Sequence, residues 1–381
     1  MNRRTFLRHL GEGIFLLGGM SLINACSGTR RNDLPPFNGE KESIKGLEKD
    51  EMEILYLASL APSSHNTQPW TVKIVEPRHW TIGSDKKRWL PAVDPDHREL
   101  FLSIGAFIEN LVIAAGAQGY KADIQIIAKD KADTEIAEVR LKKDDSQDFS
   151  VGRIKKRRTV RSHYLDQEIK PDDIRFITKH DSPSCLIPTV FPHSFYFSNS
   201  SPQGKYLQEG TIEANRNQAL RDAAQEELAN WIRWSNKEGK AYRNGLTPES
   251  MEIKGIAGFF VRSFYNRQSV LKKSFRDQTV DLVSKQVKTS GGWLVVTSQD
   301  SNISTLIEYG RVWENMLLRI RERMIGIHPM SQMLEEEPCK KQIAKDLGLT
   351  GEVQWILRIG YLKDYPDPVS LRMPVSRFVK T

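Results

Sequence analysis

Two stretches of the chain decide its fold, because residues 104–122 read IGAFIENLVIAAGAQGYKA and residues 309–327 read YGRVWENMLLRIRERMIGI. A glycine, a glutamate and an asparagine recur at identical spacing: Gly105, Glu109 and Asn110, then Gly310, Glu314 and Asn315. The first stretch is apolar almost all round at helical spacing, which predicts a buried central helix. An internal duplication is the simplest explanation, and chance similarity between two buried helices is the alternative.

Strands surround both copies. WTVKIVE (70–76), KADIQIIAKD and EIAEVRLKK are expected as strands in the first half. GGWLVVTSQD precedes the second copy and VQWILRIGY follows it, again as expected strands. A helix is expected from Asp50 to Leu60, where Pro62 ends it. The pattern predicts an α+β fold in which two related halves form antiparallel-type sheets flanked by helices.

The first 26 residues read as an export signal. Paired Arg3 and Arg4 before a short apolar run resemble the twin-arginine signal, and LINAC resembles a lipoprotein cleavage box that would lipidate Cys26. An ordinary anchor helix is the alternative. We therefore expect export by the twin-arginine translocase and a lipoprotein anchored to a membrane surface, on the periplasmic side in a diderm bacterium.

The net charge limits which partners are expected, and the chain is expected to divide into three segments after the signal. The net charge is +8, and removal of residues 1–25, with three Arg and one Glu, leaves +6. Such a surface suits an anionic lipid or ligand, and export makes nucleic acid an unexpected partner. Residues 27–49 are expected as a tether, 50–150 as the first half, and 151–381 as the second half with a helical insertion at about 203–288.

A polar loop, APSSHNTQPW (61–70), offers the first candidate site. Carboxamides at Asn66 and Gln68 donate and accept hydrogen bonds, so they complement the pyrimidine edge of an isoalloxazine ring. Ser63 and Ser64 could reach ribityl hydroxyls or phosphate. The alternative is a Ser/Asn turn that bonds its own backbone.

A basic run, KKRRTVR (155–161), offers the second candidate site. Arg157, Thr159 and Arg161 would point to one face of an extended stretch and could clamp a phosphate. A solvated basic run is the alternative. Arg372, in SLRMPVSRFV, is a weaker third candidate.

Motifs for other chemistry are absent from the sequence. It contains no CxxC and no HExxH, and its eight His are scattered, so no metal site is expected. Cys185 and Cys339 could pair, but two cysteines do not make a disulfide framework. No side-chain nucleophile or acid–base pair is evident, so no catalytic side chain is expected.

Taken in order, the motifs resemble the nitroreductase superfamily of FMN proteins: APSSHNTQPW, RRTVR, the glycine-containing central helix, HPMSQ, LRIGY and LRMPVSRFV. SSHNTQPW, DPDHREL and EELANWIRW are similar to its duplicated, Acg-like branch. The resemblance covers residues 50–381 and implies a nitroreductase-like fold.

The resemblance also implies which residues hold FMN. Phosphate contacts would come from Arg157, Thr159, Arg161 and Arg372, and ring or ribityl contacts from Ser63, Ser64, Asn66, Gln68, Met330, Ser331 and Gln332. Typical members carry Lys where this chain has Ser370, so one phosphate charge is in doubt.

Family members are homodimers with FMN between subunits. Here the first half carries the Ser/Asn/Gln loop and the second carries the Arg-x-Thr-x-Arg element, so the halves imply a single-chain pseudo-dimer with one flavin. The implied activity is reduction of nitro or quinone-type acceptors by flavin ping-pong chemistry. Since NAD(P)H is not available outside the cytoplasmic membrane, the reductant is unknown. A non-catalytic flavin-sequestering lipoprotein is the alternative, and a chain that has lost its flavin is a third.

The insertion is expected to cover the flavin. GIAGFFVRSFY supplies Phe259, Phe260 and Phe264, which we expect to lie over the flat ring and to exclude water and bulky acceptors. His65 is expected to order the loop next to the ring.

Overall fold

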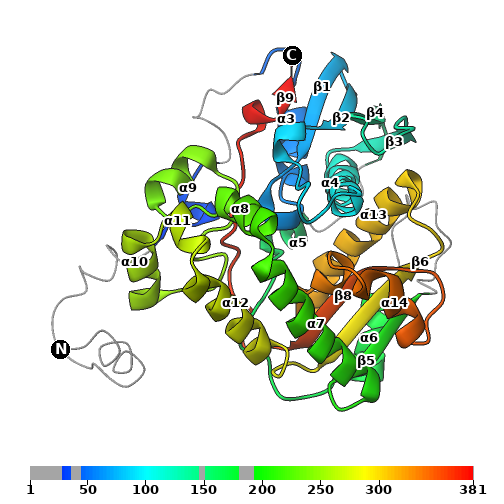
Figure 1. Ribbon diagram of the computed structural model, residues 1–381. Helices are drawn as coiled ribbons and strands as arrows, with labels where there is room; N and C mark the ends of the chain where they lie inside the picture. The colour runs from blue at the N-terminus through cyan, green and yellow to red at the C-terminus, as the bar shows by residue number, and fades with distance from the viewer. Residues whose placement is uncertain (1–27, 36–43, 146–150, 180–192, 381) are drawn as a thin grey trace.

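A computed structural model describes residues 28–35, 44–145, 151–179 and 193–380. The described chain forms two sheets, with two long helices between them and a group of helices packed to one side (Figure 1). Cys26 and Cys185 lie outside the described residues, and Cys339 is a free thiol.

The first sheet contains the strands of the first half. In chain order these are β1 (Trp70–Glu76), β2 (His79–Ser84), β3 (Tyr120–Ile126) and β4 (Glu135–Lys143), with α4 (Arg98–Ala117) between β2 and β3. Their order in the sheet is β3-β4-β2-β1, and every neighbouring pair is antiparallel. The strand predicted at 70–76 is confirmed at its full length.

The second sheet repeats this topology. Its strands are β5 (Ser194–Ser198), β6 (Gly292–Ser298), β7 (Ile325–Pro329) and β8 (Glu352–Tyr361), with α13 (Ile303–Arg319) between β6 and β7. The order is β7-β8-β6-β5, again antiparallel throughout. Strand for strand this is the arrangement of the first sheet, so the duplication extends from one helix to the whole half.

Two features distinguish the halves. A tight hairpin joins β1 to β2, whereas six helices stand between β5 and β6: α7 (Pro202–Leu220), α8 (Asp222–Trp231), α9 (Asn236–Tyr242), α10 (Gly255–Phe264), α11 (Arg267–Val270) and α12 (Lys273–Gln286). The C-terminal strand β9 (Val379–Lys380) crosses back and pairs in parallel with β1 of the first half. The second half therefore completes the sheet of the first.

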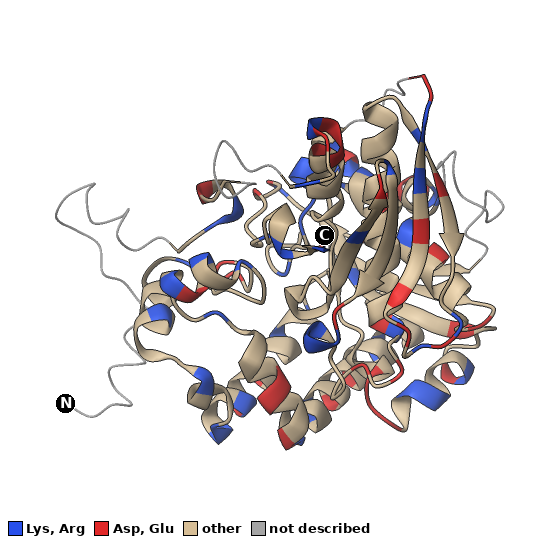
Figure 2. Ribbon diagram, turned by 90° about the horizontal axis from the view of Figure 1, so that it is seen from above, with Lys and Arg blue, Asp and Glu red and all other residues tan. Residues whose placement is uncertain are grey.

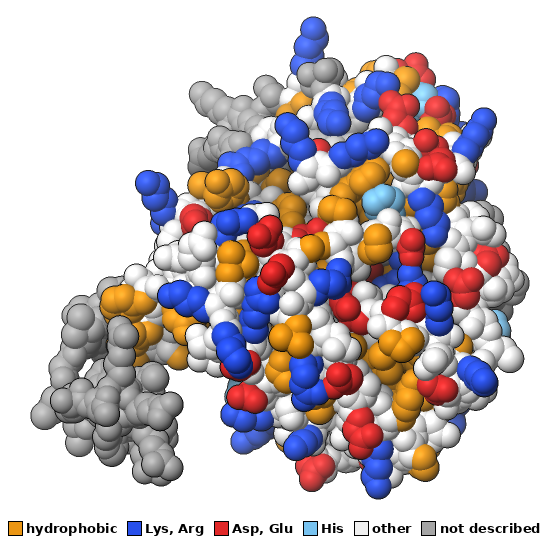
Figure 3. Space-filling model, viewed as in Figure 1, with side chains coloured by type: hydrophobic (Ala, Val, Ile, Leu, Met, Phe, Trp, Pro, Cys, Tyr) orange, Lys and Arg blue, Asp and Glu red, His pale blue; other side chains and the backbone are white. Residues whose placement is uncertain are grey.

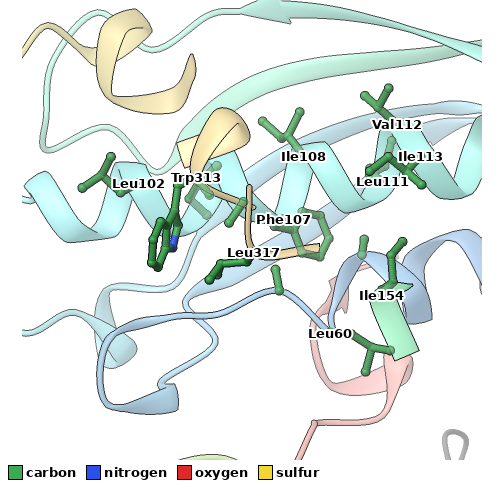
Figure 4. Close-up of a cluster of buried hydrophobic side chains, with 14 of the residues drawn as sticks. Leu60, Leu102, Phe107, Ile108, Leu111, Val112, Ile113, Ile154, Trp313 and Leu317 are labelled. Carbon is green, nitrogen blue, oxygen red and sulfur yellow. The ribbon is translucent and has the colours of Figure 1, made fainter. Parts of the chain in front are cut away.

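The two central helices cross at their equivalent glycines. A Cβ on Gly105 would collide with the carbonyl oxygen of Ile307, and a Cβ on Gly310 would collide with that of Leu102. Only glycine allows backbones this close. Around the crossing lies one continuous core, in which Phe107 and Ile108 of α4 lie near Leu317 of α13 (Figure 4).

Burial explains the apolar composition of α4. The helix is long and apolar enough to cross a membrane, but 94% of its apolar window is buried inside the protein. It is a core helix, as its pattern predicts, although it begins at Arg98, six residues before the expected start.

The second central helix ends earlier than the sequence repeat suggests. Its last residue is Arg319, a short 3-10 turn η4 (Ile320–Arg323) follows, and Met324 turns the chain with φ of 52°. Residues expected to continue the helix to 327 instead begin β7.

Shorter elements connect these parts. They are η1 (Arg31–Asp33), α3 (Lys49–Ala58), η2 (Ser64–Asn66), η3 (Lys86–Arg88), α5 (Val151–Lys156), α6 (Pro171–Thr178), η5 (Gln332–Leu334), α14 (Cys339–Asp346) and η6 (Val375–Arg377). The stretch expected as a tether is packed where it is described: Thr29 is buried, and its N–H donates to Oδ1 of Asn236 at 2.9 Å. Basic and acidic residues are interspersed over sheets and helices (Figure 2).

Candidate functional site

A cavity lies where the two halves and the helical insertion meet. The first half contributes Pro62, Ser63, His65 and Asn66; the second contributes Arg157, Arg158, Thr159, Arg161, Pro368, Val369, Ser370 and Arg372; the insertion contributes Leu246 and Ser250; and the N-terminal segment contributes Arg31. The space amounts to about 570 Å³, part of it open to solvent. Both sequence-predicted clusters thus reach one cavity.

The polar loop of the first half has a strained backbone. His65, Asn66 and Gln68 adopt φ of 48°, 53° and 53°, in the left-handed region that non-glycine residues seldom occupy. Such strain persists only where surrounding contacts hold it, and it concentrates at binding sites. The contacts that hold this loop join its polar side chains to the backbone of the insertion and to the C-terminal segment.

The two carboxamides are used within the protein. Asn66 Nδ2 donates to the carbonyls of Gly245 and Leu371 at 3.0 and 3.1 Å. Gln68 Nε2 donates to the carbonyl of Arg243 at 3.0 Å, and its Oε1 accepts from the N–H of Met373 at 2.9 Å. Gln68 is fully buried and does not line the cavity. These partners lie in the insertion and in the C-terminal segment, not in the loop's own backbone. The ring contacts of both residues stay predictions.

The two serines of the loop differ in whether they reach the cavity. Ser63 lines the cavity and its Oγ accepts from the N–H of Gln68 at 3.0 Å. Ser64 points elsewhere and donates to Glu99. Of the four loop residues predicted at the site, Ser63 and Asn66 reach the cavity.

The three residues of the basic element all line the cavity. Arg157 Nη2 donates to the carbonyl of Leu60 at 3.0 Å, and its Nε lies 3.5 Å from Oε1 of Glu314. In contrast, the guanidinium of Arg161 and the hydroxyl of Thr159 have no hydrogen-bond partner among the described residues, and both groups line the cavity. Unused donors facing a cavity are what an anionic ligand requires.

Arg372 closes the other side of the cavity. Its Nη1 donates to Asn66 Oδ1 at 2.9 Å, and its Nη2 donates to the carbonyls of Leu60 and Ala61 at 3.1 and 3.0 Å. Arg372 therefore ties the C-terminal segment to the loop of the first half. Ser370 lies beside it on the cavity wall.

Sequence reasoning missed Arg31. It lies in a polar stretch that contains no pattern specific to binding, yet it lines the cavity. Its N–H donates to the carbonyl of Val369 at 3.2 Å, and its guanidinium donates to the carbonyl of Lys155. Arg31 thus supplies a cationic group near Ser370, where the charge was in doubt.

The guanidiniums are crowded. Burial lowers the pKa of Arg372 well below its ordinary value, and Arg157 and Arg31 lower it further, against Glu314 and Tyr56. Burial likewise lowers the pKa of Arg161, opposed by Glu252. A bound anion would offset both the burial and the repulsion.

A segment of the insertion, residues 243–252, covers the cavity and is called the cover segment below. On one side Arg243 and Gly245 accept the carboxamides of the loop. On the other, Glu252 lies 3.2 Å from Arg158 and accepts from the N–H of Arg161 at 3.1 Å. Burial pushes the pKa of Glu252 up, but Ser162, the Arg161 N–H and both arginines hold it below its ordinary value.

The aromatic residues expected over the ring are elsewhere. Phe259, Phe260 and Phe264 do not line the cavity and are 43%, 37% and 67% exposed. The expectation is wrong because α10 packs its opposite face on the insertion, while Leu246 and Ser250 of the cover segment reach the cavity.

The HPMSQ residues also lie outside the lining. Met330 is fully buried in the core beside the second sheet, with its N–H bonded to the carbonyl of Ile356 at 2.9 Å. Ser331 Oγ accepts from the N–H of Ile356 at 3.4 Å. Gln332 Oε1 is buried without a partner among the described residues. Flavin contacts for these three stay predictions.

His65 reaches the cavity from the strained loop. Burial lowers the pKa of its imidazole, against Glu99 and together with Arg161, and its Nδ1 is buried without a partner in the described chain. A neutral imidazole can donate or accept one hydrogen bond there.

No cluster of His, Cys, Asp or Glu suited to a metal occurs among the described residues. The arrangement is suited to anion binding.

Comparison with known proteins gives partial matches. No protein-family model matches the chain. A Mycobacterium tuberculosis protein named "Putative NAD(P)H nitroreductase Rv3131" is 32% identical over 124 residues, 32% of this chain and 36% of that protein. Another from that species, "Putative NAD(P)H nitroreductase acg", is 39% identical over 69 residues, 18% and 20% of the two chains. The chain spans about a third or less of the length of these relatives.

Solved structures give a weaker likeness. The FMN-dependent nitroreductase NfnB from Mycobacterium smegmatis, in complex with NADPH, is 12% identical, with 60% of this chain and 96% of that chain covered and a TM-score of 0.35. The curated relatives are the stronger comparison, and their names support the nitroreductase superfamily for the matched part of the chain.

Proposed function

We propose that this chain is an FMN-binding, nitroreductase-like oxidoreductase of the Acg-like type, with one flavin site per chain. The observation that carries the proposal is the composition of the cavity. Arg157, Thr159 and Arg161 from one half meet Ser63 and Asn66 from the other, so neither half alone contains the site. The partial matches to curated nitroreductases support the same conclusion.

The donor set fits the phosphate of FMN. Arg161 and Thr159 present unused donors, and Arg31, Arg157 and Arg372 surround them with positive charge. Pro62, Leu246, Pro368 and Val369 supply apolar wall for a ring. His65 Nδ1 remains available for a polar edge.

FMN, when bound, would supply two-electron transfer between a reductant and a nitro or quinone-type acceptor. The protein's part is binding and access. Arginines fix the phosphate end, the strained loop places His65 and Asn66, and Leu246 and Ser250 shield the site from water. The physiological reductant and acceptor are small molecules of unassigned identity.

Flavin content tests the proposal. Protein made in the cytoplasm should purify yellow and release about one FMN per chain on acid treatment, because the two halves complete one cavity. Two flavins per chain would contradict the single site. Colourless protein that takes up no added FMN would contradict flavin binding altogether.

A second candidate is a flavin-sequestering protein that does not turn over. The closed cover segment favours it, since residues 243–252 bond to both sides of the cavity. Dithionite is small and should reduce the flavin quickly in either case. Rapid NADPH oxidation with a quinone supports the enzyme; dithionite reduction without NADPH oxidation supports sequestration.

We further propose export through the twin-arginine route and lipidation at Cys26. The support is the sequence NRRTFLR followed by LINAC. Cys26→Ser should move the protein from the membrane fraction to the soluble fraction, and Arg3→Lys with Arg4→Lys should retain it in the cytoplasm. An unchanged membrane fraction for Cys26→Ser would point to another anchor.

A further inference from the structure

The insertion presents an apolar face that covers nothing in the described chain. Ile256, Phe259, Phe260 and Phe264 lie on one side of α10 and are four of the nine exposed large hydrophobic residues of the described chain. Figure 3 shows hydrophobic side chains gathered at the left edge of the molecule, where Figure 1 places α10. An exposed patch of this kind marks an interaction surface.

The opposite side of α10 anchors it to the protein. Val261 and Tyr265 pack against a core of the insertion, and Gly258 is buried. The exposed aromatics contact one another: ring centroids lie 6.2 Å apart for Phe259 and Phe260, and 5.5 Å apart for Phe260 and Phe264. The helix is therefore amphipathic, held on one face and without a partner from the described residues on the other.

The segment that contains α10 is basic. Residues 254–276 contain six Lys or Arg and no Asp or Glu. Lys254, Arg267 and Lys272 among them are exposed and form no ion pair in the described chain, whereas Lys273 pairs with Asp277 at 2.7 Å. An amphipathic helix with Phe on one face and basic residues around it has the composition of a helix that lies in the membrane interface.

The start of the described chain lies beside this helix. Gly28 packs so closely on Glu249 that a Cβ would collide with its carboxylate, and Glu249 forms an ion pair with Arg262 of α10. Cys26 precedes Gly28 by two positions, at most about 7 Å of chain. A lipid at Cys26 would thus hold a bilayer next to α10.

We propose that the apolar face of α10 docks on a bilayer that contains anionic lipid, with Phe259 and Phe264 inserted among the acyl chains. The basic residues around α10 meet the headgroups, at about fivefold in affinity for each charge near the surface. This surface is separate from the flavin cavity, so flavin content reports the proposed function independently.

Site-specific quenching tests the proposal on the full chain. In a Cys26→Ser, Cys185→Ser, Cys339→Ser background, Phe264→Cys carries an environment-sensitive fluorophore. Vesicles of phosphatidylglycerol and phosphatidylethanolamine contain a nitroxide-labelled lipid. We expect a blue shift and strong quenching at 264. Leu220→Cys is the matched control, because Leu220 is 68% exposed and Phe264 67%; it should show neither change.

Three results would overturn the proposal. One is an unquenched label at 264 on vesicle-bound protein, or no binding to vesicles. Another is a blue shift without lipid that grows with protein concentration, which would identify a second copy as the occupant. The third is a blue shift without lipid at every concentration, which would mean that the chain covers α10 itself. As support, Phe259→Ser with Phe264→Ser should lower vesicle partition at least about tenfold.

Discussion

Glu109 of α4 and Glu314 of α13 occupy equivalent positions in the two halves, yet they have different partners. Glu109 forms an ion pair with Arg311 at 3.2 Å and accepts from Asn315 at 3.2 Å, all inside the helix pair. Glu314 faces Arg157, which lines the cavity. A symmetric ancestor would carry two equivalent sites. Here Glu109 pairs within the helix pair, which we call the closed side, and Glu314 faces the cavity residue Arg157, which we call the open side.

The different partners of the two glutamates indicate how one site survives a duplication. Arg311 stands where the first copy has Ala106. A single side chain on α13 therefore provides the arginine that pairs with Glu109. On the other side the neutralising arginine comes from the basic element and stays accessible to a ligand. Structural and binding roles thus fall on equivalent glutamates, and substitutions can separate them.

The largest expected effect is common to both halves. Gly105→Ala and Gly310→Ala should each lower the free energy of unfolding by at least about 4 kcal/mol, because the added methyl group collides with backbone of the facing helix. Gly239→Ala in α9 is the matched control, because its new methyl would meet only side chains, Leu371 at 3.3 Å and Thr29 at 3.9 Å. Urea unfolding measures the free energy of unfolding of the three variants. A mild effect at one glycine alone would show that the crossing is not symmetric.

The second-largest expected effect is the loss of stability when the Glu109–Arg311 ion pair of the closed side is broken. Arg311→Met removes one partner of a buried ion pair and should cost about 3 kcal/mol of unfolding free energy. Arg311→Met with Glu109→Gln should recover part of that loss, since Glu109 no longer carries a buried unpaired charge. The recovery is partial because Glu308, which lies 2.8 Å from Arg311, still loses its ion pair with that arginine. FMN affinity should not change in either variant. A loss of FMN affinity that tracks Arg311→Met would mean that the closed side takes part in binding.

On the open side we expect the opposite: a loss of FMN affinity with little loss of stability. Arg161→Ala should weaken FMN binding about 10- to 150-fold, the loss of one charge-assisted hydrogen bond, with little change in stability, because its guanidinium has no hydrogen-bond partner in the described chain. Riboflavin, which lacks the phosphate, should lose much less. Arg153→Ala, an exposed arginine paired with Glu322, controls for net charge. Equal losses for FMN and riboflavin would assign Arg161 a structural role.

Sequence periodicity predicted much of the fold because each pattern is local. The strand at 70–76, the buried helix in 104–117 and the helical insertion all follow from spacing and composition. β7 was missed, since a left-handed turn at Met324 ends an otherwise helical pattern. The α+β fold with two sheets is confirmed.

The site was predicted only in part, because its geometry depends on distant backbone. Arg157, Thr159 and Arg161 were recognisable as hydrogen-bond donors on one face of an extended stretch. The carbonyls at 243, 245 and 371 that occupy the carboxamides leave no trace in the sequence. Arg31 gave no signal either, because its neighbours are polar and its contacts lie more than a hundred residues away.

The smallest expected effect is the pH dependence of the open side. Burial raises the pKa of Glu314 to about 7, against Arg157, Asn110 and Arg372. A carboxyl whose pKa is higher in the folded than in the unfolded chain keeps its proton on folding, so its contribution to stability is present below about pH 4.5 and is lost as pH rises through 7. Glu314→Gln cannot ionise and should escape that loss, on the order of 1–2 kcal/mol. Urea unfolding at pH 5 and pH 8 should show the variant gaining on the parent at the higher pH. Glu109→Gln, on the closed side, should lower stability at both pH values, because it removes one of the two ion pairs of Arg311. If both glutamine variants behave alike, the two glutamates are equivalent in energy as well as in position, and the distinction between the open and closed sides fails.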